Sequence, residues 1–208
     1  MRTETALEGK LNTITHGFGA VLGVLGLVFL VKDNTNKTDF SLLSVVVYGL
    51  TIIILFAASA LYHAVKNEKK RHYFRILDHI SIYLLIAGTY TPVLLISLEE
   101  SKGWPLFYIV WGIAAVGAVL KLFFTGRFEM FSTFLYLVMG WLIVFDFNSL
   151  SDIIGSSGIL LLFAGGLSYT IGIVFYALKN LPYNHVIWHL FVLAGALFHF
   201  LMIFLYII

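Results

Sequence analysis

The sequence predicts an all-α integral membrane protein, built as a single domain (1–208) that forms a seven-transmembrane helix bundle. Composition is the first observation: 60% of the 208 residues are apolar or aromatic and only 12% are charged, whereas soluble domains carry about 25% charged residues. The mean hydropathy of +0.95 agrees with this. The apolar residues also gather into stretches of about 20 residues, the length that a helix needs to cross the hydrocarbon core of a bilayer.

Seven such stretches follow one another with short connections. They span residues 15–31, 41–65, 77–98, 104–124, 130–148, 157–178 and 185–207. Backbone polar groups must find partners within the protein in lipid, and the alternating pattern of barrel strands is absent, so helices are expected. Pro92 is expected to kink the third helix. The first residues lack the pattern of a cleavable signal peptide, so the first helix is expected to stay in the protein.

The distribution of basic residues predicts the topology. With a cytoplasmic N-terminus, the inside segments hold all of the 13 lysines and arginines except Lys32, Lys37 and Lys102. Because cytoplasmic loops are enriched in these residues, the N-terminus is expected inside and the C-terminus outside, the reverse of G-protein-coupled receptors. We expect a multi-pass membrane protein with membrane lipids as partners. No basic stripe typical of nucleic-acid binding is present, and the oligomeric state stays open.

The sequence contains no cysteine. Disulfides, iron–sulfur clusters, thiolate metal ligands and cysteine nucleophiles are therefore excluded. Any transition-metal site must use histidine, carboxylate or water ligands.

Ionisable residues within spanning segments mark candidate functional sites, because they are costly in lipid. His63 ends the second stretch, and His185 and His189 begin the seventh; the predicted topology places all three at the cytoplasmic leaflet. His185 and His189 are four residues apart and so project from one helix face. Three histidines with an open fourth position are typical of catalytic zinc. The sequence thus predicts a Zn²⁺ site, with copper, nickel or iron as alternatives.

Asp78, at the start of the third stretch, is expected at the same depth. It is interpreted as a catalytic base or an orienting group for a metal-bound water, or else as a further ligand. Ser59 lies one turn before His63, and its hydroxyl is expected either to stabilise a developing oxyanion or to bond to its own helix.

Glu8, Asn12 and His16 are spaced by four residues and form one polar stripe on the first helix. The stripe is interpreted either as a face at the membrane interface or as a set of groups beneath the metal.

The other histidines are given separate interpretations. His199 follows His189 by ten residues, or about 15 Å along a helix, so it is expected to be hydrogen-bonded inside the bundle. His72 and His79 flank a basic loop and are interpreted as head-group or solvent contacts.

Taken in order, these motifs resemble the progestin and adipoQ receptor (PAQR) family. The motifs are Glu8-x3-Asn12-x3-His16-Gly17, which looks like the bacterial hemolysin III-like branch, then Ser59-x3-His63, Asp78, and His185-x3-His189 followed by His199. The resemblance covers nearly the whole chain. It implies seven helices with the N-terminus inside, zinc bound by His63, His185 and His189, and contact between Asp78 and the zinc-bound water. It also implies ceramidase-like amide hydrolysis and, through the bacterial branch, a place in a bacterial inner membrane. The long N-terminal extension of the animal receptors is missing, so hormone reception is not expected.

Three functions remain open. The preferred one is a zinc-dependent hydrolase that acts on an amide or ester bond of a lipid entering laterally from the membrane. The second is a pore-forming or lytic protein, as the name hemolysin III suggests. The third is a non-catalytic sensor of membrane state in which zinc only holds helices together.

Overall fold

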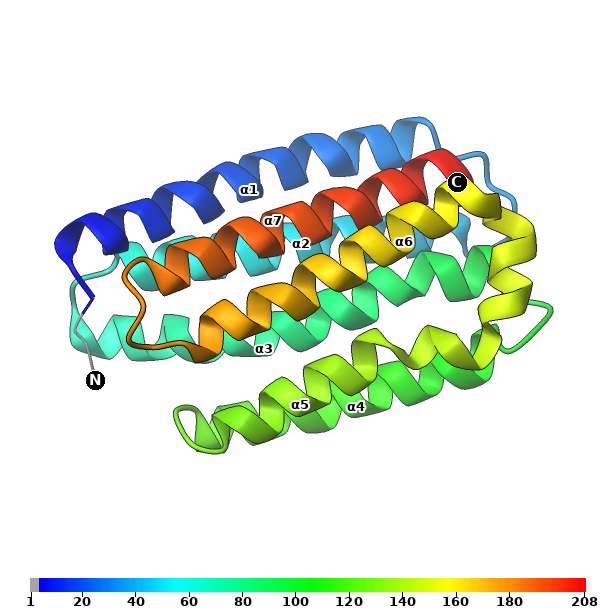
Figure 1. Cartoon of the computed structure of the whole chain (residues 1–208). Helices are drawn as coiled ribbons and strands as arrows, with labels where there is room; N and C mark the ends of the chain where they lie inside the picture. Colours follow the sequence, from blue (N-terminus) through cyan, green and yellow to red (C-terminus); the bar gives the residue numbers. More distant parts are fainter. Residues whose placement is uncertain (1–3) are drawn as a thin grey trace.

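The computed structural model describes residues 4–208 and, within them, seven α-helices that lie side by side in one bundle (Figure 1). The α-helices are α1 (Ala6–Lys32), α2 (Ser41–Ala64), α3 (Glu68–Pro92), α4 (Gly103–Phe124), α5 (Glu129–Gly140), α6 (Phe147–Ala177) and α7 (Asn184–Met202). Short π-helical segments, Val93–Ser97 and Ile203–Ile207, extend α3 and α7, and a 3-10 segment, Leu142–Asp146, joins α5 to α6. The described part of the chain contains no strand.

Six helical stretches among residues 4–208 are long and apolar enough to cross a membrane. One of them, Glu129–Ala177, includes both α5 and α6. Large apolar side chains on the outside of the bundle are exposed, as lipid contact requires, including Phe18, Val21 and Val28 on α1. This is the architecture of a multi-pass membrane protein.

Two helices begin earlier than the apolar stretches predict. α1 starts at Ala6, where the Thr5 hydroxyl accepts a hydrogen bond from Glu8 N (3.3 Å) and Thr5 N donates to the Glu8 carboxylate (2.8 Å). α3 starts at Glu68, where the Asn67 side chain accepts from Lys70 N (3.0 Å). Caps of this kind satisfy the free N–H groups of a first turn. The helices therefore carry the polar sequence beyond the apolar core.

The predicted connection between the fifth and sixth helices, 148–157, is helical in the structure except for a break at Gly155, which falls inside it. α5 ends at Gly140 and α6 already begins at Phe147, so the polar residues after Phe147 are helical. The chain changes direction instead through the 3-10 segment and at Gly155, where φ is 62° and ψ is −175°. Glycine adopts this conformation without steric penalty. Figure 1 shows α5 and the later part of α6 running in opposite directions.

Close helix contacts bring the elements of the site together. α1 packs against α2 and α7, α2 against α3, and α6 against α7. A Cβ at Gly19 would come within 2.8 Å of the Phe56 ring, so glycine is needed for the approach of α1 to α2. The start of α1, the end of α2 and the starts of α3 and α7 all lie at one end of the bundle, and the C-terminus lies at the other (Figure 1).

Candidate metal centre

The structure brings together the three predicted metal ligands. His63 comes from the end of α2, and His185 and His189 come from the first turns of α7. One ring nitrogen from each lies within 4.8 Å of the others. Three imidazoles at this spacing can bind one ion with small side-chain movements, because Zn–N bonds are about 2.0–2.1 Å long.

The site is buried, and the ring nitrogens of His63 make no hydrogen bond to the described residues. The His63 side chain is 4% exposed, and His189 is 1% exposed. Neither ring nitrogen of His63 has a hydrogen-bond partner among residues 4–208. Buried polar groups in proteins are nearly always hydrogen-bonded. The nitrogens without hydrogen bonds belong to a group of three imidazoles, which are common metal ligands. The group therefore fits a metal ion.

Thr15 of α1 sets the orientation of His189. Its hydroxyl donates to Leu11 O (2.9 Å) and lies 3.3 Å from Nδ1 of His189. Since the hydroxyl donates to Leu11 O, its oxygen can accept from Nδ1–H in the His189 tautomer that carries the proton there. The unprotonated nitrogen is then Nε2, which is left for a metal.

The polar stripe of α1 faces the interior of the bundle. Glu8, Asn12 and His16 are 3%, 0% and 2% exposed. The His16 ring stacks on His189 with centroids 3.4 Å apart and an interplanar angle of 9°. Glu8 accepts from Tyr183 N (2.6 Å), which ties α1 to the start of α7. The interpretation of the stripe as an interfacial face is therefore wrong, and the stripe lies beside the histidines.

Asp78 and Ser59 share one cavity with the three histidines. The cavity has a volume of about 290 Å³. Asp78 reaches it from α3, and its Oδ2 lies 3.4 Å from Nδ1 of His79. Ser59 reaches it from α2, is 2% exposed and lies beside the Asp78 carboxylate. His79 is only 14% exposed and lines the cavity, so the interpretation of this residue as a head-group contact is wrong.

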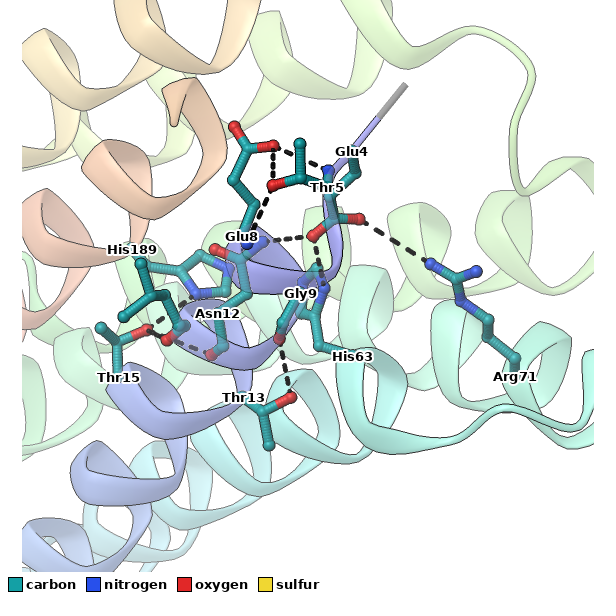
Figure 2. Close-up of polar contacts among 11 residues, drawn as sticks. Glu4, Thr5, Glu8, Gly9, Asn12, Thr13, Thr15, His63, Arg71 and His189 are labelled. Atoms are coloured by element: carbon teal, nitrogen blue, oxygen red, sulfur yellow. Dashed lines mark hydrogen bonds and ion pairs between the residues drawn. The ribbon is translucent and has the colours of Figure 1, made fainter. Parts of the chain in front are cut away.

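Glu4 is a site residue that the sequence-based interpretation missed. Figure 2 shows its carboxylate between α1 and α2: Oε1 accepts from Asn12 Nδ2 (2.7 Å) and lies 3.7 Å from His63 Nδ1. Oε2 lies 3.9 Å from the Arg71 guanidinium. The capping box of Thr5 and Glu8 is the one sequence signal that could have placed Glu4 directly before the start of a helix.

His199 lies away from the centre, on the later part of α7. Its Nε2 is 3.2 Å from Leu162 O on α6, and its ring packs against Tyr169. This confirms the expected hydrogen-bonded histidine inside the bundle.

Comparison with known proteins gives consistent relatives over the whole chain. A family profile described as haemolysin-III related matches residues 5–200. The chain is 41% identical to Hemolysin-3 of Bacillus cereus, covering 99% of this chain and 94% of that protein. It is 42% identical to a Hemolysin-3 homolog of Bacillus subtilis, covering 92% and 91%. The human monocyte to macrophage differentiation factor is 28% identical, covering 98% and 86%. No solved structure matches significantly.

Proposed function

The chain belongs to the haemolysin-III related family, and we propose that it is a zinc-dependent intramembrane hydrolase that cleaves an amide or ester bond of a lipid. One observation carries the proposal. Three buried imidazoles converge in a cavity that also contains a carboxylate, Asp78, and a hydroxyl, Ser59. A purely structural metal site needs neither of these groups nor a cavity beside the metal.

The proposal includes the topology. The chain would cross the membrane seven times with its N-terminus in the cytoplasm, in keeping with the distribution of lysine and arginine. The histidines would then lie in the cytoplasmic leaflet, where a lipid's polar group is within reach. The start of α1 and the end of the helix that follows α7 lie at opposite ends of the bundle, which supports an odd number of crossings (Figure 1).

Each residue of the site has a role in this chemistry. His63, His185 and His189 would hold the zinc ion, which supplies Lewis acidity and lowers the pKa of a bound water. Asp78 would accept the proton of the attacking water and deliver it to the departing amine or alcohol. The water oxygen ends on the acyl carbon as the C–N or C–O bond breaks. Ser59 would donate a hydrogen bond to the negative charge that develops on the carbonyl oxygen.

Metal content and turnover test the proposal together. Purified full-length protein should contain about one zinc per chain by plasma mass spectrometry, and it should hydrolyse fluorescent lipid amides or esters. The double variant His63→Ala/His189→Ala should lose both properties. His199→Ala, which removes a histidine outside the cavity, should keep both. Full zinc occupancy in the double variant would refute the site assignment. Zinc without turnover on any lipid would favour the sensor with structural zinc.

A second candidate function is membrane lysis, because the two Bacillus relatives carry the name hemolysin. Dye release from liposomes by the purified protein measures it directly. Release that persists in His63→Ala/His189→Ala would favour a lytic function that is independent of the histidine site. Release that disappears with the metal would instead assign lysis to lipid hydrolysis.

A further inference from the structure

Lys121 is a buried cation in a membrane-spanning helix. It lies on α4, is 2% exposed and lines the same cavity as the histidines. Its backbone carbonyl accepts a bond from Thr125, but its ammonium group makes no hydrogen bond or ion pair with any residue from 4 to 208. An unpaired charge in this position is costly, so intramembrane lysines usually have a functional partner.

Two more cations line the cavity near Lys121 and share one carboxylate. Arg75 donates to Oε1 of Glu129 (2.8 Å), and Lys179 donates to Oε2 (3.2 Å). Both oxygens of Glu129 are thereby engaged. Lys121 lies close enough to Glu129 and Arg75 to interact with their charges, but its ammonium group makes no hydrogen bond to either residue. Arg75, Lys121 and Lys179, here called the cationic wall, therefore carry two positive charges more than Glu129 balances.

The remaining carboxylates of the cavity already have partners. Glu4 contacts Asn12, His63 and Arg71. Glu8 bonds to Thr5 and to the backbone of Tyr183, and Asp78 lies against His79. These three carboxylates surround the histidines, whereas the cationic wall is built by α3, α4 and the turn that follows α6. The cavity thus has an acidic side at the histidines and a cationic side with spare charge.

The surroundings of Lys121 favour a lipid as the source of the missing anion. Lys121 also borders a second cavity of about 180 Å³ whose lining includes three phenylalanines, Leu120 and Arg127. The lining side chains Phe124, Phe128 and Phe131 are 40%, 68% and 51% exposed on the outside of the bundle. An acyl chain can pack against such an apolar surface, but a free inorganic anion gains nothing from it.

We propose that the cationic wall binds the phosphate of an anionic membrane phospholipid, with the Lys121 ammonium as its buried contact. That this lipid is the substrate rests on the hydrolase function proposed above: its phosphate would lie on the cationic side while its ester lies toward the histidines. The binding itself requires neither zinc nor turnover.

Competition between lipids tests the binding. Fluorescent phosphatidylglycerol bound to the purified full-length protein in detergent micelles is displaced with unlabelled phosphatidylglycerol, phosphatidylcholine or inorganic phosphate. Phosphatidylglycerol should compete about tenfold better than phosphatidylcholine, as expected for a charge-assisted hydrogen bond in a buried site. Inorganic phosphate should not displace the probe at lipid concentrations. Displacement by inorganic phosphate as strong as that by lipid would overturn the lipid assignment.

Variants at Lys121 provide the decisive comparison. Lys121→Met keeps the length of the side chain without its charge and should abolish the preference for the anionic lipid. Lys121→Arg should retain it. Lys69→Met removes an exposed lysine at the same end of the bundle and should have no effect. An unchanged preference in Lys121→Met, or an equal loss in Lys69→Met, would overturn the proposal.

Two further variants separate folding and catalysis from binding. If Lys121→Met does not fold, Lys179→Met at a half-exposed position should weaken the preference about threefold, as expected for a partly exposed charge. His63→Ala/His189→Ala should keep the preference for phosphatidylglycerol. A protein without hydrolase activity would therefore still show lipid selectivity, so failure of the catalytic proposal can be told apart from failure of this one.

Discussion

The Thr15 hydroxyl on α1 lies 3.3 Å from Nδ1 of His189 on α7, one of the three candidate metal ligands. Outer contacts of this kind commonly change metal affinity 10–100-fold. Thr15→Val keeps the shape of the side chain but removes the hydroxyl. We expect zinc affinity to fall by about tenfold or more, as measured by competition with a chromophoric chelator.

Two controls identify the contact as the cause. Thr15→Ser keeps a hydroxyl and should retain most of the affinity. Thr13→Val removes a hydroxyl that donates to Gly9 O (3.0 Å) on the same helix, without contact to a histidine. If Thr13→Val weakens zinc binding as much as Thr15→Val does, the effect comes from the helix and not from His189.

The charge of Glu4 is expected to strengthen zinc binding at the same site. Its Oε1 lies 3.7 Å from His63, so a carboxylate stands close to the charge that a divalent ion would bring (Figure 2). Glu4→Gln keeps an oxygen for Asn12 but removes the charge. Because the side chain is 36% exposed and water screens it, we expect a loss of about three- to tenfold in zinc affinity.

Ionic strength and position provide the controls for Glu4. The difference between Glu4→Gln and the wild type should shrink in high salt, since screening weakens an exposed charge. Glu68→Gln removes an exposed carboxylate from the first turn of α3 and should leave zinc affinity unchanged. Equal effects of the two substitutions would show a general surface-charge effect.

Substitution of Asp78 is expected to lower turnover without loss of the metal. It lies in the cavity beside Ser59 and His79 but outside the group of three converging nitrogens. Asp78→Asn should keep about one zinc per chain and lower the hydrolysis rate by about 10²–10⁴-fold, the usual contribution of a general base. Loss of zinc together with activity would assign Asp78 as a metal ligand instead.

The sequence alone predicts the helical fold and the meeting of His63 with the pair on α7, for physical reasons. Apolar length predicts spans because lipid demands it, and the basic residues predict which helix ends share a depth. Both signals are long-range averages along the chain. They are insensitive to single residues such as Gly155, whose φ of 62° turns the chain inside a polar stretch.

The contacts that complete the site depend on side chains whose partners lie on other helices. Nothing in the spacing around Thr15 indicates that it meets His189. Nor does the spacing around Lys121 indicate that its ammonium group makes no hydrogen bond within residues 4–208. Glu4 precedes the apolar stretch, and only the helix cap at Thr5 carries it to His63. Such pairings follow from helix rotation and close packing, which hydropathy does not encode.

Substitution of Asp146 is expected to lower the stability of the fold and to leave the metal centre intact. It is 6% exposed, and its Oδ2 accepts from Lys102 N (3.0 Å) while its Oδ1 accepts from the Ser149 hydroxyl (2.7 Å). It thus ties the turn before α6 to the start of α4. Asp146→Ala would remove both hydrogen bonds, at a cost of about 1–3 kcal/mol.

The loss should appear as a fall of about 2–10 °C in the thermal midpoint, scaled for a chain of this size, followed in detergent by the fluorescence of the four tryptophans. Asp152→Ala is the matched control, because it removes an exposed carboxylate from the same helix. Its midpoint should match the wild type, and both variants should keep their zinc. A loss of zinc in Asp146→Ala at temperatures where the protein is folded would contradict the independence of the two ends, since Asp146 lies at the end of the bundle opposite the histidines.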